Sequence, residues 1–190
     1  MPSDELLYQI GLTLINGIGD SHAKNLVAHC GSAKAVFETQ KSSFLKIPGV
    51  GEHVANFVAN GKDVLKEAEK EVRFVEENNI TPLFYTDNKY PQRLRFCNDS
   101  PVLLYYRGNA NLNADKVVAV VGTRLPSEYG IQQTEKFIDE LNGSGILIVS
   151  GLAYGIDVLA HKKSLDNDLD TVGVVAHGLD RIYPTVHEAI

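Results

Sequence analysis

The stretch VVAVVGTRLPSEYG, residues 117–130, decides the fold. Five apolar residues run into Gly122, and a helical pattern then begins near Ser127, as in a strand–turn–helix segment. Two more apolar runs follow, with helical patterns between the three: strands at 117–121, 146–149 and 171–176, and helices at 127–142 and 153–166. This alternation predicts an α/β fold with a parallel sheet and right-handed helical crossovers.

Upstream of residue 80 the pattern is helical, and short apolar runs at 80–85 and 102–106 begin the strand-rich part. Two helical segments resemble each other, LINGIGDSHAKNLV (14–27) and FLKIPGVGEHVANFV (44–58), with corresponding residues 32 positions apart. A GxG turn between short helices is similar to the helix-hairpin-helix module, whose amides can face a phosphate. The alternative is that these turns only pack a small helical domain.

The composition is that of a globular protein, with 44% hydrophobic and 22% charged residues and a net charge of −6. This charge disfavours a protein that coats nucleic acid by bulk electrostatics, and it leaves room for a local basic pocket.

Cys30 and Cys97 lack metal-site or disulfide spacing, so we expect buried free thiols. Asp4 and Glu5 stand where a signal peptide would be basic, and no apolar run approaches the roughly 18 residues of a membrane span, so we expect a cytoplasmic location and no membrane contact.

Three glycine-bearing loops follow the three strands, at 122–130, 150–161 and 177–187. In a parallel sheet these loops share the carboxyl edge, where helix N-termini and free amides favour phosphate. The first loop lacks the glycines of a dinucleotide fingerprint, so we expect no such cofactor. Arg124 instead offers a permanently charged fork suited to phosphate. The alternative is a surface ion pair with Glu128 or Asp157.

Asp157 and His161 are spaced i,i+4 on the second crossover helix and can meet. Either they orient a pocket, or they form a local hydrogen bond that anchors the helix. The sequence shows no recognisable pair of a nucleophile and an adjacent base, and no carboxylate cluster resembles a metal site. We therefore expect no catalytic residues and no metal.

Five motifs carry a family resemblance, in order over residues 90–187: YPQRL, SPVLLYYRG, VVAVVGTRLPSEYG, SGLAYGIDVLAH and GLDRIYP. Together they resemble the DNA-processing protein A family (DprA, also called Smf). The resemblance implies a SAM-like, helix-hairpin-helix domain over 1–79 and a Rossmann-like DNA-binding domain over 80–190. In that family the second domain continues beyond the last motif, so the resemblance implies that the domain is incomplete at its C-terminus here.

The resemblance also implies a function without enzymatic activity. Such proteins bind incoming single-stranded DNA without sequence preference during natural transformation in competent bacteria, and they load the RecA recombinase onto it. The full-length protein would form a homodimer. The implied DNA phosphate-binding residue is Arg124, with Gly122, Thr123, Gly151, Gly155 and Gly178 shaping the pocket floor. From the residues themselves we add Ser127, which marks the helix start, as phosphate-binding, and Asp157 and His161 as pocket-orienting. The tyrosines available for base stacking are Tyr129, Tyr154 and Tyr183, and each has packing as its alternative role.

Two alternatives belong to other functional classes. One is a nucleotide-binding enzyme of the related phosphoribohydrolase-like Rossmann families, which share a glycine-rich phosphate edge. Their PGGxGTxxE motif does not occur in this sequence. The other is a protein-interaction module in which the nucleotide fold is degenerate.

Overall fold

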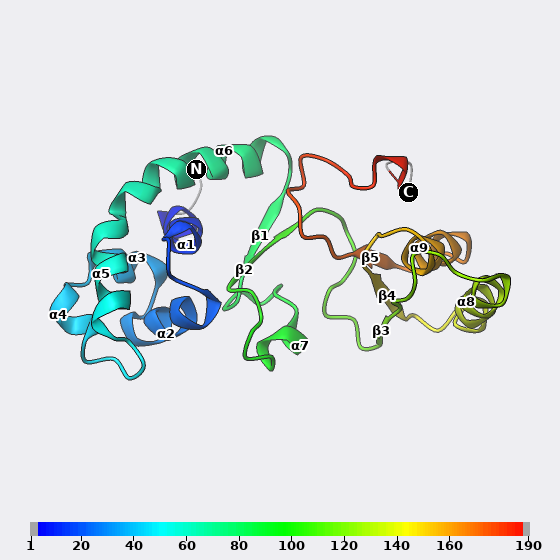
Figure 1. Ribbon diagram of the computed structural model, residues 1–190, viewed down its shortest axis with the longest axis horizontal. Coiled ribbons are helices and arrows are strands. Elements are labelled where there is room, and N and C mark those ends of the chain that lie inside the picture. Colours follow the sequence, from blue (N-terminus) through cyan, green and yellow to red (C-terminus); the bar gives the residue numbers. More distant parts are fainter. Residues whose placement is uncertain (1–3, 188–190) are drawn as a thin grey trace. The chain divides into compact units, whose positions relative to one another are not determined.

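The computed structural model describes residues 4–187, which form two compact units that divide between Arg107 and Gly108 (Figure 1). Each unit has its own hydrophobic core. Within residues 4–187, no helix combines the length and the apolar composition that crossing a lipid bilayer requires.

The first unit is built mainly from helices, as the sequence predicts. They are α1 (Asp4–Leu14), α2 (Asp20–Cys30), α3 (Ala33–Glu38), α4 (Lys41–Phe44), α5 (Glu52–Asn60), the 3-10 turn η1 (Gly61–Val64) and α6 (Leu65–Glu77). Their apolar faces meet in one core, in which Ile10, Leu26 and Phe44 are fully buried. The exposed side of α6 carries an ion pair between Glu69 and Arg73, with the nitrogen and oxygen 4.0 Å apart.

The predicted internal repeat is present as two turns of the same geometry, α1–α2 and α4–α5. Gly17 and Gly49 both have positive φ, 85° and 80°. Equivalent backbone hydrogen bonds follow 32 residues apart: Ile18 N to Ile15 O and Val50 N to Ile47 O, then Ala23 N to Gly19 O and Ala55 N to Gly51 O. The two segments therefore fold alike as helix–turn–helix hairpins.

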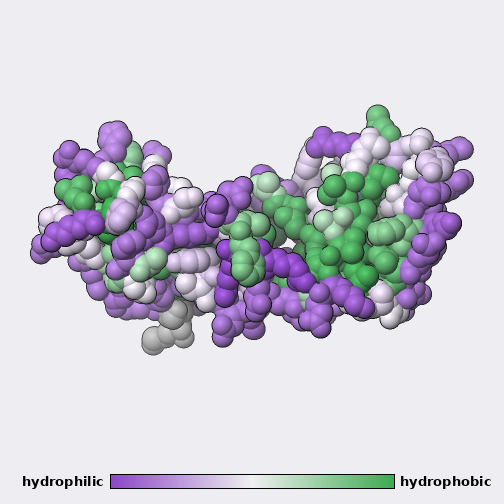
Figure 2. Space-filling view, turned by 90° about the horizontal axis from the view of Figure 1, so that it is seen from below, coloured by the Kyte–Doolittle hydropathy of each residue, from purple (hydrophilic) through white to green (hydrophobic). Residues whose placement is uncertain are grey.

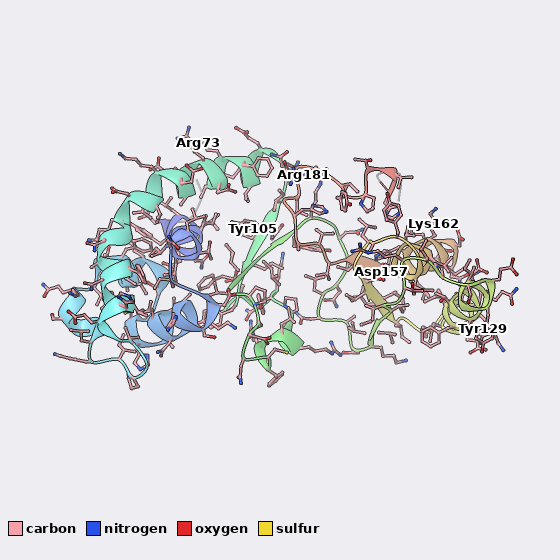
Figure 3. The ribbon with its side chains drawn as sticks, viewed as in Figure 1. Arg73, Tyr105, Tyr129, Asp157, Lys162 and Arg181 are labelled. Atoms are coloured by element: carbon pink, nitrogen blue, oxygen red, sulfur yellow. The ribbon has the colours of Figure 1, made fainter. Side chains whose placement is uncertain are left out.

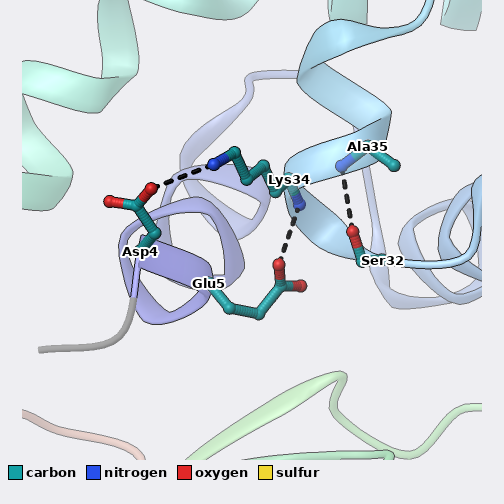
Figure 4. A network of polar contacts seen from close by, with 5 residues as sticks. All are labelled: Asp4, Glu5, Ser32, Lys34 and Ala35. Atoms are coloured by element: carbon teal, nitrogen blue, oxygen red, sulfur yellow. Dashed lines mark hydrogen bonds and ion pairs between the residues drawn. The ribbon is translucent and has the colours of Figure 1, made fainter.

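The N-terminus of α3 is held by side chains from two places (Figure 4). The Ser32 hydroxyl accepts a hydrogen bond from the Ala35 amide at 3.0 Å, which caps the helix. The Glu5 carboxylate on α1 accepts from the Ala33 amide at 2.7 Å, and Asp4 pairs with the Lys34 ammonium at 2.9 Å. A negative charge at a helix N-terminus is favourable, so these contacts join α1 to α3.

Two short strands, β1 (Thr81–Phe84) and β2 (Leu103–Tyr106), form an antiparallel pair in the first unit, and α7 (Gln92–Arg95) lies between them in the chain. Phe84 and Leu103 pack into the helical core. The parallel pairing predicted from the later alternation therefore does not extend to these strands. The change from helices to strands comes near residue 80, as expected, whereas the compact unit continues to Arg107. The assignment of domains at residues 79 and 80 stays a prediction.

The second unit contains the predicted parallel sheet. Its elements are β3 (Val117–Ala119), α8 (Glu128–Glu140), β4 (Leu147–Ser150), α9 (Ile156–Asp166), β5 (Thr171–Gly173) and η2 (Thr185–His187). The strands are parallel in the order β3–β4–β5, with Val118 opposite Ile148 and Val149 opposite Val172. This order follows the chain, so the reversal of strand order that often marks a ligand site does not occur among the described strands.

Helices α8 and α9 pack against each other on one face of this sheet (Figure 1). Ile138 of α8, Ile148 of β4 and Ala160 of α9 form the small core between helices and strands. Among the described residues of the second unit, no α-helix covers the opposite face. Figure 2 shows apolar side chains gathered on the second unit, and Val121 and Val174, just beyond the strand ends, are 76% and 61% exposed.

Candidate nucleic-acid interface

The loops that follow β3 and β4 meet at the carboxyl edge of the sheet. The Ser150 hydroxyl donates a hydrogen bond to the Val120 carbonyl at 2.6 Å, and the Ile156 amide at the start of α9 donates to the Thr123 carbonyl at 3.1 Å. These contacts fix the backbone of the first loop against the start of the second crossover helix. The predicted site residues from 122 to 155 are therefore brought together at one edge.

The backbone of the first loop packs directly against Gly155. It precedes α9 with φ of 80°, a conformation that side-chain-bearing residues rarely adopt. A Cβ at this position would lie 2.7 Å from the carbonyl carbon of Arg124, so only glycine leaves room for that backbone. The group that comes this close to Gly155 is the protein's own backbone, at Thr123 and Arg124.

The other predicted glycines are also packed closely by neighbouring side chains. A Cβ would lie 2.7 Å from Ile156 Cγ1 at Gly122, 2.7 Å from Asp157 Oδ2 at Gly151, and 2.5 Å from Asp180 Oδ1 at Gly178. These glycines allow the loops to fit the start of α9 and their own turns. Their contact with a phosphate stays a prediction.

Arg124 is exposed at the end of this supported loop. Within residues 4–187 it forms an ion pair with neither Glu128 nor Asp157, so the alternative role as a surface ion pair is not seen. The Thr123 hydroxyl accepts from the Leu125 amide at 3.2 Å, and the Ser127 hydroxyl accepts from the Gly130 amide at 3.2 Å. Ser127 thereby caps α8. Arg124 thus precedes the N-terminus of α8 in the chain, and the dipole at such a helix end also favours an anion.

Asp157 and His161 are both buried, with 8% and 2% of their surface exposed. The local hydrogen bond between them, one of the two alternatives, does not occur in the described structure: His161 Nδ1 instead lies 2.7 Å from the Thr171 hydroxyl on β5. Burial lowers the pKa of His161, and the nearby Asp157 acts in the opposite direction. A neutral imidazole gives little attraction to phosphate, so the contact of His161 is one that holds α9 to the sheet.

Of the three tyrosines predicted to stack on bases, two have largely exposed side chains. Tyr129 (Figure 3) and Tyr183 are 70% and 69% exposed, whereas Tyr154 packs edge-on against His187 with ring centroids 5.2 Å apart. Sequence reasoning missed two exposed cations of this unit, Lys162 on α9 and Arg181 in the loop after β5 (Figure 3). Arg181 lies within the quoted motif GLDRIYP, in a loop at the carboxyl edge of the sheet. That position could have identified it as a candidate site residue from the sequence.

The two helical hairpins of the first unit carry carboxylates where a phosphate would bind. Asp20 and Glu52 occupy equivalent positions, in the first turns of α2 and α5. Asp20 accepts a hydrogen bond from the Val102 amide at 2.7 Å, and Glu52 lies 3.7 Å from the Lys41 ammonium. Negative charge at both helix starts repels phosphate, and this favours the packing role for the hairpin turns.

Metal-binding geometry is not found in the described part of the chain, where no three His, Cys, Asp or Glu side chains gather as ligands. Both cysteines are free. Cys30 is half-buried, but Cys97 is exposed, so the expectation of two buried thiols was wrong for Cys97, which follows the short surface helix α7.

Comparison with known proteins finds similarity to proteins of DNA processing. The family model of DNA recombination-mediator protein A matches residues 81–190. The DNA processing protein DprA of Streptococcus pneumoniae is 43% identical over 104 residues, which cover 55% of this chain and 36% of that protein. Protein Smf of Synechocystis is 30% identical over 191 residues, covering 97% and 47%. The chain thus spans less than half the length of these curated relatives.

A solved structure is also similar in fold. The X-ray structure of DprA from Streptococcus pneumoniae matches with a TM-score of 0.57 and 29% identity, covering 90% of this chain and 62% of that one.

Proposed function

The chain belongs to the DNA recombination-mediator protein A family, and we propose from this that it binds single-stranded DNA without sequence preference at the carboxyl edge of its parallel sheet. The observation that carries the proposal is Arg124, an exposed guanidinium without an ion-pair partner in the described chain, on a loop whose backbone rests on Gly155. A guanidinium can bind a phosphate by donating two parallel hydrogen bonds.

The exposed rings of Tyr129 and Tyr183 support a preference for single strands. Unpaired bases can stack on aromatic side chains, whereas the bases of a duplex are stacked on each other. Phosphate and ring contacts do not read base identity, which agrees with binding that is independent of sequence.

The proposal extends to a role as a mediator rather than an enzyme. In this role the protein would protect DNA during natural transformation and load the RecA recombinase, as a homodimer in its full-length form. The support for this role is the family match over residues 81–190.

The test is a fluorescence-anisotropy titration of single- and double-stranded oligonucleotides at several salt concentrations, with the 190-residue chain and its Arg124→Ala variant. Loss of one phosphate contact should weaken single-strand binding by roughly tenfold for all sequences and reduce the salt slope by about 1. Arg73→Ala is the matched control, since Arg73 is an exposed arginine on α6 (Figure 3). Equal affinity of the Arg124 and Arg73 variants would refute the role of Arg124.

A further inference from the structure

A basic pocket lies within the first unit. It has a volume of about 450 Å³ and is lined by Lys24 of α2, Arg95 of α7, and Tyr85, Thr86 and Ser100 beside the two antiparallel strands. Two of the five side chains are cationic and none is acidic. Sequence reasoning did not connect them, because Lys24 and Ser100 are 76 residues apart.

Lys24 contributes a half-buried ammonium whose partners are neutral. It donates hydrogen bonds to the carbonyl of Ser100 and to the hydroxyl of Ser100, the latter at 2.7 Å. Within residues 4–187 it has no carboxylate partner. A cation that is partly removed from water without a counter-charge raises the free energy of the folded state, and a bound anion would offset this cost.

Two acidic residues near the pocket, Asp20 and Asp87, accept hydrogen bonds from backbone amides. Asp20 accepts from the Val102 amide at 2.7 Å, and Asp87 accepts from the Phe84 amide at 2.8 Å. Neither carboxylate pairs with Lys24 or Arg95 in the described chain. Lys24 and Arg95 therefore have no ion-pair partner in the described chain, and each can still pair with an anionic ligand.

Arg95 and Tyr85 complete the pocket. Arg95 is exposed and uses one terminal nitrogen to donate to the Asp87 carbonyl, which leaves the rest of its donor fork for an anion. The Tyr85 hydroxyl donates to the Lys24 carbonyl at 3.4 Å, and burial raises the pKa of this phenol. The phenol therefore stays neutral and adds an apolar wall with no negative charge.

We propose that this pocket binds a phosphate group, through the Lys24 ammonium and the Arg95 guanidinium, with the Ser100 and Thr86 hydroxyls as further partners. Two cations of this kind, one compact and one planar, suit a phosphate ester. The ester can belong to a free nucleotide or to a nucleic-acid strand. The site is independent of Arg124, which lies in the other unit.

The test is an NMR titration of the uniformly ¹⁵N-labelled 190-residue chain with three separate probes: inorganic phosphate, thymidine 5′-monophosphate and a short oligothymidylate. Saturable shifts are expected at the amides of Tyr85, Thr86 and Ser100. Arg95→Gln should weaken this binding on the order of tenfold, the size expected for loss of a charge-assisted hydrogen bond. Arg95 is exposed, so this variant should keep the fold.

The matched control is Arg73→Gln, which removes the same charge from α6 and should bind like the wild type. Equal affinity of all three probes would assign the site to the phosphate group alone, and tighter binding of the oligothymidylate would assign it to a strand. The proposal fails if no probe shifts these amides saturably, or if the Arg95 and Arg73 variants bind equally. Shifts at residues 122–127 report on Arg124 separately, so either site can fail without the other.

Discussion

At the scale of single residues, Gly155 determines where Arg124 stands. The glycine has a positive φ, and the backbone of Thr123 and Arg124 occupies the space that a side chain would need. The arginine is thus positioned by a residue 31 places away in the chain rather than by its own neighbours. The side chain of Arg124 remains exposed at the loop surface.

Gly155→Ala should destabilise the second unit by about 2 to 4 kcal/mol, because it combines backbone strain with a clash against Arg124. The matched control is Gly130→Ala within α8, where a Cβ would meet only ordinary contacts at 3.6 and 3.7 Å. That change should stabilise the helix by about 0.5 to 1 kcal/mol. Urea unfolding of both variants measures the difference, and equal stabilities would contradict the packing described for Gly155.

His161 makes the stability of the second unit depend on pH. Burial lowers its pKa in the folded chain below the ordinary value of 6.5, so the unfolded chain binds more protons between the two values. Stability should therefore be full above pH 6.5 and decline as the pH falls from 6.5 through the lowered value. In His161→Gln this part of the decline should disappear. Thermal unfolding at pH 7.5 and at pH 5.5 tests it, and an identical decline in both proteins would count against burial as the cause.

At the scale of elements, the residue that caps α8, Ser127, is also one of the predicted phosphate-binding residues. The Ser127 hydroxyl caps the helix by accepting from the Gly130 amide. Its predicted role in DNA binding and its role in helix stability therefore coincide in one side chain, and a simple deletion would change both.

A pair of substitutions at Ser127 separates the two roles. Ser127→Ala should lower stability by about 1 kcal/mol through loss of the cap, whereas Ser127→Asp should retain the cap. The aspartate adds negative charge beside Arg124, so Ser127→Asp should bind single-stranded DNA more weakly than Ser127→Ala. Urea unfolding and anisotropy on both variants provide the comparison. If Ser127→Asp binds DNA as tightly as the wild type, α8 does not begin at the DNA interface.

The positions of the helices and strands were largely predictable from the periodicity of hydrophobic residues. The contacts between these elements were not. The apolar runs at 117–121 and 146–149 predicted β3 and β4, and the GxG turns predicted the hairpin repeat. Helix α9 begins at Ile156 rather than at 153, because Gly155 turns the chain to meet a loop that is distant in sequence. The contacts of Lys24 with Ser100 and of His161 with Thr171 likewise join separate elements, and local pattern carries no signal for them.

At the scale of the whole molecule, the chain has two separate cores of unequal size. The core of the first unit draws on the helices and on β1 and β2, whereas that of the second is centred on Ile138, Ile148, Ala160 and Leu169. The strands β1 and β2 were predicted with the second domain, and only their packing shows that the first core includes Phe84 and Leu103.

Because the two cores are separate, a cavity made in one core should destabilise its own unit and not the other. Ile138→Ala and Leu26→Ala each remove a fully buried side chain, and each should cost about 2 to 5 kcal/mol. Hydrogen exchange followed by mass spectrometry should show faster exchange in β4 and α9 for the first variant, and in α2 and α3 for the second. Faster exchange throughout residues 4–187 in either variant would show that the units unfold as one.

The contact between Thr123, Arg124 and Gly155 has a kinetic consequence. The loop backbone is already in place in the free chain, so a DNA strand that binds there as proposed would need no slow rearrangement of it. Association should then follow a single exponential whose rate rises linearly with DNA concentration and falls as ionic strength increases, because diffusion of a charged strand limits the encounter. Stopped-flow mixing would reveal a plateau in the rate if the loop first had to change conformation.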